Sequence, residues 1–279
     1  MCRVLQVSPS AYYAWSQRPV SAHQQRDEFL GLLIHQIHEE SCGRYGSPRI
    51  YHELRAQGIR CSQKRVARLM HEHHLVARKR RRFVSTTDSR HAHPVAQNVL
   101  NREYQVEVVA AVNRAWAGDI TYIPTAGGWL YLAVVLDLKS RKVIGWSMAN
   151  TLEKALVQDA LNMALRQRFT QRATRELLFH SDRGSQYAAQ DYRKQLEDAG
   201  IVCSMSRKGN CWDNAPLESF FATLKKELVH QENYQNHEQA KASLFYYIEV
   251  FYNRQRRHSA LGFISPNDYE QSLLTGCPA

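Results

Sequence analysis

The sequence lacks several features that would assign it to a specialised class of protein. No apolar run approaches the roughly 18 residues that a membrane-spanning helix needs, and the first residues lack the apolar segment of a signal peptide. There is no internal repeat, no low-complexity tract and no sustained heptad pattern. These absences argue against a membrane protein, a repeat array and a long coiled coil. We therefore expect a folded protein that has no membrane partner.

Cysteine is sparse and scattered, which argues against a disulfide framework. The chain has six cysteines in 279 residues and no C-x-x-C pair: Cys2, Cys42, Cys61, Cys203, Cys211 and Cys277. Thiols without such a pattern are typical of a reducing compartment. We expect reduced cysteines in a cytoplasmic protein.

Acidic residues are few in the first part of the chain. The whole sequence carries a formal net charge of +11, and residues 1–100 contain 16 Lys and Arg against 7 Asp and Glu. The remaining residues contain 21 against 19, which is close to balance. A basic front half predicts contact with a polyanion such as nucleic acid. The alternative is a basic solvated surface with no ligand.

Three helices are predicted in the basic part. Residues 27–40 form the first, "SPRIYHELRAQG" the second with Ser47 as N-cap, and "SQKRVARLMHEHH" the third with Ser62 as N-cap. In the third helix an apolar face comprises Val66, Leu69, Met70 and His73, whereas three basic residues point elsewhere: Lys64, Arg65 and Arg68. Two short helices, of which the second is basic and faces outward, resemble a helix-turn-helix module that binds DNA. Many helical hairpins share this pattern.

A run of five cations follows these helices: Arg78, Lys79, Arg80, Arg81 and Arg82. The polar stretch that continues to about residue 102 has little periodicity and is typical of a linker. Its position next to a DNA-binding module favours contact with phosphates over a plain solvated tether.

The remaining sequence alternates strands and helices. Strands are predicted at residues 115–124, 128–138, 143–149, 176–182 and 201–206. Helices are predicted at residues 152–169 with Thr151 as cap, from about residue 183 to 199, from about 215 to 228, and from about 237 to 253. An antiparallel meander followed by strands with helical crossovers predicts a mixed five-stranded sheet with helices on both faces.

The helix in "KGNCWDNAPLESFFATLKKEL" carries an unusual pair of charges. Asp213 or Asn214 is its expected N-cap, Pro216 fits its first turn, and an apolar stripe follows the 3.6-residue period. Glu218 lies at the rim of that stripe. Lys225 returns to nearly the same face about 10 Å further along the helix axis. Taken alone, the two residues are best explained as ordinary solvated charges.

Three carboxylates stand at element positions that can converge at one edge of the sheet. Asp119 lies in the first strand, Asp182 ends the fourth, and Glu218 opens the helix after the fifth. Carboxylate oxygens are preferred ligands of Mg²⁺ and Mn²⁺, and two such ions can activate an attacking oxygen and stabilise a leaving one in phosphodiester chemistry. Asp137 is better explained as a turn residue, and Asp213 as a cap.

The three acids and their surroundings resemble a known family. Asp119 and Asp182, then Glu218 after 35 intervening residues and Lys225 seven residues later, match the D…D(35)E motif of retroviral integrases and related bacterial transposases. The second-frame (OrfB-type) transposases of the IS-three family of insertion sequences are similar in the words "WAGDITYI", "LDLKSRKVIGW", "HSDRGSQY", "GNCWDNAPLESFFATLKKEL" and "YNRQRRHSALGFISP". "GRYGSPRIYHELRAQGI" with "KRVARLM" resembles the helix-turn-helix segment before their catalytic core.

This resemblance implies an α/β fold with an RNase H-like core and DDE transposase chemistry. Water would free a 3′-hydroxyl at an element end, and that hydroxyl would attack another phosphodiester with no covalent protein–DNA intermediate. The expected organisation is a helix-turn-helix region at residues 1–77, a basic linker at 78–105, and a catalytic core with a C-terminal helical extension at 106–279. Asp119, Asp182 and Glu218 would hold two Mg²⁺ or Mn²⁺ ions.

Further residues complete the expected site. DNA contacts are expected from Lys225, Lys208 and the basic residues named above, with Asn214 and His180 supporting the ligands. His180 shares the strand face of Asp182 by the period of two, although simple packing explains it equally well.

The expected partners are the terminal inverted repeats and target DNA, further copies of this chain on that DNA, and an upstream-frame fusion or partner. Such a protein would lie at the bacterial nucleoid. One departure from retroviral integrases is that His35, His38, Cys42 and Cys61 lack the spacing of a zinc module.

Two other functions remain open from the sequence. A nuclease with the same fold would cut DNA without joining it, and a helix-turn-helix regulator would bind DNA without cutting it. The basic N-terminal region argues against the first, and the intact acids argue against the second.

The five-cation run predicts a salt-dependent contribution to DNA binding. Replacing Arg78 to Arg82 with alanine in the full chain should flatten the plot of log K against log salt, by about 0.9 for each phosphate that the variant no longer neutralises. Measuring duplex binding over a series of salt concentrations checks this. An unchanged slope would make the run a passive linker.

Overall fold

The computed structural model describes residues 2–78, 96–169, 177–207 and 211–276. The chain forms two compact units, residues 1–78 and residues 79–279. In the described ranges, no helix has both the length and the apolar character that crossing a bilayer requires.

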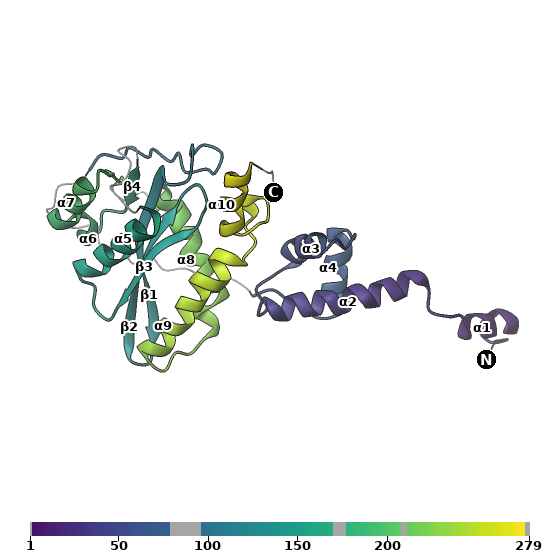
Figure 1. The fold of residues 1–279 in the computed structure, drawn as a ribbon. Coiled ribbons are helices and arrows are strands. Elements are labelled where there is room, and N and C mark those ends of the chain that lie inside the picture. The colour runs from purple at the N-terminus through teal and green to yellow at the C-terminus, as the bar shows by residue number, and fades with distance from the viewer. Residues whose placement is uncertain (1, 79–95, 170–176, 208–210, 277–279) are drawn as a thin grey trace. The chain divides into compact units, whose positions relative to one another are not determined.

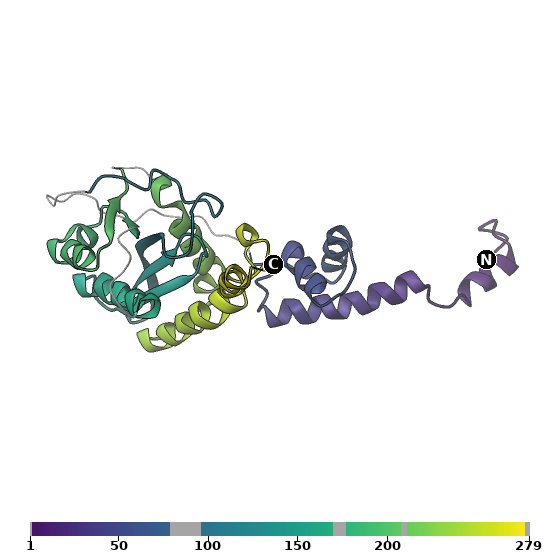
Figure 2. The same ribbon diagram turned by 45° about the horizontal axis from the view of Figure 1, so that its top comes forward.

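The first unit is helical. Its elements are α1 (Pro9–Ser16), α2 (Ala22–Glu40), α3 (Ser47–Ala56) and α4 (Gln63–Glu72). Helices α2, α3 and α4 pack on one another, and Figure 2 shows α3 and α4 along one side of α2. Their contact is apolar and fully buried at Leu30, Ile34, Ile50, Leu54 and Val66. Helix α1 buries none of its residues.

Helix ends in this unit follow local capping more closely than apolar periodicity. The Ser62 hydroxyl accepts the Arg65 amide, so the predicted cap of α4 is confirmed. Helix α2 begins five residues before the predicted start because Ser21 caps it by accepting the Gln24 amide. Ser47 lies inside α3, and Gly46 occupies the N-cap position. The predicted apolar face of α4 extends only to Met70, since His73 is exposed.

The second unit contains one mixed sheet in the strand order β3-β2-β1-β4-β5. The strands are β1 (Ala115–Thr125), β2 (Gly128–Asp137), β3 (Val143–Ala149), β4 (Leu178–Ser181) and β5 (Val202–Met205). The first three form an antiparallel meander, and β4 and β5 continue the sheet in parallel from β1. The predicted five-stranded mixed sheet is confirmed.

Helices cover both faces of this sheet (Figure 1). The helices of this unit are α5 (Lys154–Arg168), α6 (Ser185–Ala188), α7 (Gln190–Asp198), α8 (Ala215–Glu227), α9 (His237–Phe245), the π-helix η3 (Tyr246–Tyr252) and α10 (Pro266–Thr275). Single 3-10 turns lie at η1 (Cys211–Asn214), η2 (Val229–Gln231) and η4 (Ser259–Leu261). Predicted helices are therefore present, with three differences in their details.

The differences have local causes. Thr151 does not cap α5, since its hydroxyl donates to the Glu153 carboxylate and the helix begins at Lys154. The predicted helix ending at residue 199 is divided into α6 and α7, because Ala189 has an extended backbone (ψ 139°). The last predicted helix changes from α to π geometry after Phe245.

Strand β2 explains why the sheet needs two covers. Its residues from Leu132 to Asp137 are all buried, although neighbouring residues point to opposite faces. Ala133 and Val135 belong to a core with α5, α6 and α7, whereas Leu132 and Val134 face the other side, toward α8 and α9. A strand buried on both faces reads as a continuous apolar run, which is what the sequence shows.

Close contact between β3 and α5 depends on a glycine. A Cβ atom added to Gly145 would lie 2.2 Å from the backbone oxygen of Ala160, so no other residue fits without moving the helix. This contact fixes α5 against the sheet on the face opposite α8.

Candidate active site

Two of the predicted acids are brought together by strand register. Strands β1 and β4 are parallel neighbours in which Gly118 pairs with Ser181. The next residue along each strand direction is Asp119 and Asp182, respectively. Neighbouring strands lie about 4.8 Å apart, so these two carboxylates are adjacent at the centre of the sheet.

Local hydrogen bonds hold both carboxylates. The Ile120 amide donates to Oδ1 of Asp119 at 2.7 Å, and the Gly184 amide donates to Oδ1 of Asp182 at 2.8 Å. Gly184 leads directly into α6, so the turn after β4 is closed on the carboxylate of Asp182. The two side chains are thereby oriented by their own backbone surroundings.

Glu218 and Lys225 come from α8, which packs on β1. Asp119 pairs with Val134, whose side chain lies on the face that α8 covers. Helix α8 buries Leu217, Phe220, Phe221 and Leu224, and leaves Glu218 in its first turn exposed. The apolar stripe thus fixes the helix, and its rim presents the third acid and the lysine near the strand acids.

The electrostatics of Asp119 show that these groups act on one another. Burial raises the pKa of Asp119 well above its usual value, and the negative charges of Asp182 and Glu218 raise it further. The Ile120 amide and the positive charge of Lys225 oppose this rise. The carboxylates are therefore held together at an electrostatic cost that a bound cation would relieve.

The shifts of Glu218 and Lys225 are simpler. Glu218 is exposed as a residue, but partial desolvation of its carboxyl raises its pKa. The pKa of Lys225 is lowered by burial, against the opposing charge of Asp119.

The donor set suits a hard divalent cation. Three carboxylates in mutual repulsion supply the oxygen ligands that Mg²⁺ and Mn²⁺ prefer. Within the described ranges, no three side chains of His, Cys, Asp or Glu already surround one ion position. The site is therefore a pair of adjacent aspartates with a glutamate nearby, whose distance depends on how α8 is held.

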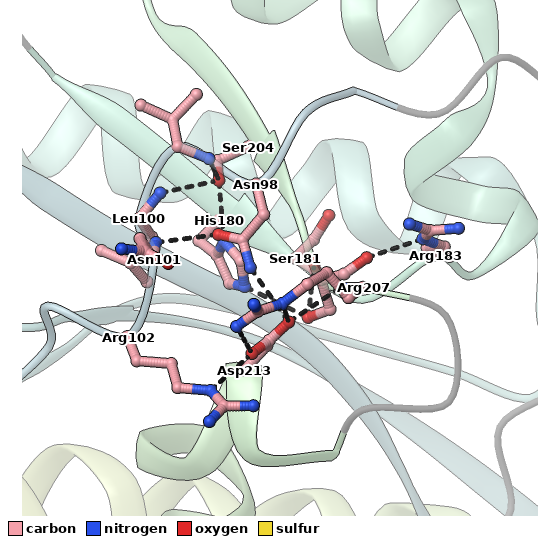
Figure 3. A network of polar contacts seen from close by, with 12 residues as sticks. Asn98, Leu100, Asn101, Arg102, His180, Ser181, Arg183, Ser204, Arg207 and Asp213 are labelled. Atoms are coloured by element: carbon pink, nitrogen blue, oxygen red, sulfur yellow. Dashed lines mark hydrogen bonds and ion pairs between the residues drawn. The ribbon is translucent and has the colours of Figure 1, made fainter.

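His180, two residues before Asp182, lies in a hydrogen-bond network with serines of and after β5 (Figure 3). Its Nδ1 atom is 2.9 Å from the Ser204 hydroxyl, and its Nε2 atom is 3.1 Å from the Ser206 hydroxyl. Ser204 Oγ also accepts the amides of Val99 and Leu100 at 2.9 and 3.2 Å, so its own proton goes to Nδ1. The proton of the imidazole must then lie on Nε2 and point to Ser206.

This network accounts for the charge state of His180. The side chain is fully buried, and burial lowers its pKa to about 4 against the opposing charge of Asp213. A protonated ring would donate from Nδ1 as well, so the Ser204 hydroxyl, which already accepts two backbone amides, would have to accept a third hydrogen. The histidine is thus packed and neutral, and it joins β4 to β5 and to the segment before β1. Support of the metal ligands by His180 stays a prediction.

Asp213 is not the cap that the sequence pattern predicts. Its carboxylate is fully buried and paired with Arg207 and Arg102. Asn214 occupies the N-cap position of α8, yet its side chain makes no capping hydrogen bond. The sequence pattern offered Asp213 or Asn214 as the cap. The position is confirmed for Asn214 and is wrong for Asp213, whose side chain pairs instead with Arg207 and Arg102. Asp137 is a turn residue as predicted, accepting the amides of Asn113, Lys139 and Ser140.

The predicted DNA contacts differ in their surroundings. Lys64 is exposed, whereas Arg65 and Arg68 both pair with Asp27 of α2 at 2.7 Å. These two arginines therefore also hold α4 on α2. The Arg78 amide donates to the Gly43 backbone oxygen. Five predicted contacts lie outside the described residues: Lys79, Arg80, Arg81, Arg82 and Lys208.

Sequence reasoning missed a second buried pair on α8. Glu227, in its last turn, accepts Arg256 through both carboxylate oxygens and the Tyr247 hydroxyl. A glutamate at a helix C-terminus opposes the helix dipole, and this was a signal that it has a specific partner.

The neutral His180 predicts a particular pH dependence. The pKa in the folded chain lies below that of the unfolded chain, so the unfolded state binds the extra proton between about pH 6.5 and 4. The contribution of the neutral His180 to the free energy of unfolding is fully present above this window. It decreases as the pH drops through the window, by up to about 3 kcal/mol. In His180→Gln this contribution is missing, so the difference in unfolding free energy between the two proteins should shrink from pH 7 to pH 4. Urea titrations across that range measure it, and a constant difference would contradict the neutral network.

Known proteins are similar to this chain over nearly its whole length. Family models match at residues 24–83 (HTH-like domain), 109–211 and 218–274 (both integrase core domain). The "Insertion element IS600 uncharacterized 31 kDa protein" of Shigella sonnei is 45% identical over 97% of this chain and 97% of its own length. "Transposase InsF for insertion sequence IS3A" of Escherichia coli (strain K12) is 44% identical over 98% of this chain and 94% of its own.

Among solved structures, the catalytic core domain of BIV integrase matches 59% of this chain and 98% of its own at 20% identity, with a TM-score of 0.43. The matched core models agree with the mixed sheet, so the RNase H-like α/β fold with a helical region before it is confirmed. The chain belongs to the IS3-type family of insertion-sequence transposases, which have an HTH-like domain and an integrase core.

Proposed function

We propose that this DNA transposase cuts at the ends of its insertion sequence and joins the freed 3′-hydroxyl to another phosphodiester, with Asp119, Asp182 and Glu218 as its catalytic acids. The observation that carries this is the register of β1 and β4, which sets Asp119 beside Asp182. Helix α8 packs on the same strand and carries Glu218.

The three carboxylates would hold two Mg²⁺ or Mn²⁺ ions. When bound, such ions supply an activated attacking oxygen and stabilise the leaving oxygen. The chain's own contribution is to keep three acids together in surroundings that raise the pKa of Asp119 and Glu218. This arrangement favours cation binding, because a cation removes the repulsion that the fold otherwise bears.

Lys225 would hold the DNA beside the acids. It lies on the same face of α8 as Glu218, about 10 Å along the axis, and close enough to Asp119 for each to shift the pKa of the other. A lysine is a compact point charge that suits a phosphate oxygen. We assign it to positioning of the DNA backbone.

Each segment of the chain would have its own role in the reaction. Residues 1–77 would bind the terminal inverted repeats, residues 78–105 would follow the DNA as a basic linker, and residues 106–279 would carry out cleavage and joining. Target DNA, further copies of the chain and an upstream-frame product would complete the assembly. Such a protein would act on the nucleoid in the bacterial cytoplasm.

Substitution of the acids tests the assignment. Asp119→Asn, Asp182→Asn and Glu218→Gln should each reduce cleavage and joining of a terminal-repeat substrate by at least about a thousandfold while duplex binding persists. Asp119→Asn should be at least as stable as the wild type at pH 7, because a carboxyl with a raised pKa costs stability when it is charged.

Asp137→Asn is the matched control, since Asp137 is a buried carboxylate of the same sheet that caps a turn. It should lower stability and spare activity. Near-normal joining by any one triad variant would refute the triad. Supplying a pre-cut 3′-end separates a transposase, which joins it, from a nuclease, which does not.

The role of Lys225 has its own control in its neighbour. Lys225→Ala should weaken binding of terminal DNA and slow joining by about tenfold, because it removes one charge contact of roughly 1.4 kcal/mol. Lys225→Arg should recover part of this decrease. Lys226→Ala removes an equal charge from the adjacent position and should have little effect. Equal and small decreases in both alanine variants, measured in one joining assay, would show that Lys225 makes no specific contact.

A further inference from the structure

Helix α8 is not fixed at its N-terminus by its own cap. Asn214 holds the N-cap position without a side-chain capping bond. Within the described part of the chain, both polar atoms of this buried side-chain amide find no hydrogen-bond partner. Because no side chain caps this helix start, its position must be fixed by other contacts.

Asp213, the residue before it, supplies a much stronger attachment. Its carboxylate is fully buried and accepts five hydrogen bonds from three residues. Oδ2 accepts the Asn98 side-chain amide (2.9 Å), the Arg207 backbone amide (2.8 Å) and Arg207 Nε (3.1 Å). Oδ1 accepts Arg207 Nη2 and Arg102 Nε, both at 2.9 Å.

These partners connect two other segments of the chain to the start of α8 (Figure 3). Asn98 and Arg102 belong to the segment that enters β1, and Arg207 follows β5. The same segment is fastened to β5 by Ser204, which accepts the amides of Val99 and Leu100. The start of α8 is thus tied to both the entry and the last strand of the sheet.

Five hydrogen bonds to one buried carboxylate restrict where the start of α8 can lie. Both arginines keep the pKa of Asp213 well below its usual range, led by the Arg207 hydrogen bond. The carboxylate is fully buried and the two arginine side chains are 42% and 48% exposed, so removing an arginine leaves a buried charge with fewer partners and is destabilising.

We propose that Asp213 is a positioning residue for Glu218. Glu218 lies five residues further on, about 7.5 Å along the axis of the helix, so a shift at Asp213 moves its carboxylate relative to Asp119 and Asp182. This inference rests on the proposed metal-binding role of the three acids. It assigns to Asp213, Arg102 and Arg207 the task of bringing the third ligand to the aspartate pair.

Metal binding by the full chain, measured without DNA, tests this role. Mn²⁺ should raise the midpoint of thermal unfolding of the wild type, and the half-saturating concentration reports metal affinity. Asp213→Asn should increase that concentration by about 10-fold or more, as is typical when a residue that orients a ligand is removed. Arg102→Gln should increase it less, because Arg207 stays in place.

A structural role alone would give a different result. Arg168→Gln is the matched control, since Arg168 forms a largely buried ion pair with Glu270 away from α8. It should lower the unfolding midpoint and leave the half-saturating Mn²⁺ concentration unchanged. If Asp213→Asn behaves in the same way, the positioning role is refuted.

Arg102→Gln and Glu218→Gln separate a failure to fold from a loss of metal binding. Should Asp213→Asn fail to fold, Arg102→Gln decides the question, because its side chain is 42% exposed and its removal is milder. Glu218→Gln checks the underlying assignment. If Glu218→Gln binds Mn²⁺ as the wild type does, the proposed ligand set is wrong and the inference falls with it. If only Glu218→Gln loses affinity, the ligand set stands and Asp213 has no part in it.

Discussion

Helix α8 is held at both ends by arginines that pair with buried carboxylates, and the proposed geometry of the candidate site depends on this attachment. Asp213 just before the helix pairs with Arg207 and Arg102, and Glu227 in its last turn pairs with Arg256. Between them the apolar stripe packs on the sheet. Such pairs contribute little net stability, because desolvation offsets attraction, yet they strongly disfavour other arrangements. They therefore suit a helix that must stand in one position.

The acids at the centre make the opposite contribution. Asp119 has a raised pKa because it is buried among like charges, so at neutral pH this part of the fold is destabilising. The surrounding sheet tolerates this because β1 and β2 are long and largely buried. Stability is thus supplied by the sheet and its helices, and a small region at its centre is kept in an unfavourable state that a cation would relieve.

Some features were predictable because they depend on residues close in the sequence. Ser62 caps α4 through an amide three residues away, and Asp137 closes its turn through amides two and three residues away. The three acids were predictable because strand ends and helix starts can be placed from local patterns, and because their spacing matches a known motif. Fold class followed from the order of these elements.

Other features could not be predicted from residues close in the sequence. Asp213 does not cap α8, because its partners include Asn98 and Arg102, more than 100 residues earlier in the chain. Arg65 and Arg68 do not simply point away from the fold, since Asp27 on another helix binds both.

The sequence by itself determined the two-part organisation and the five strands, and it named three candidate acids, because periodicity, capping and motif spacing are local properties. Only the tertiary structure decided which groups meet. Register between β1 and β4 sets Asp119 beside Asp182, and Arg102 from a distant segment pairs with the buried Asp213 carboxylate just before the helix that carries Glu218. Both depend on packing between segments far apart in the chain, and a pattern within one segment carries no information about its partner's position.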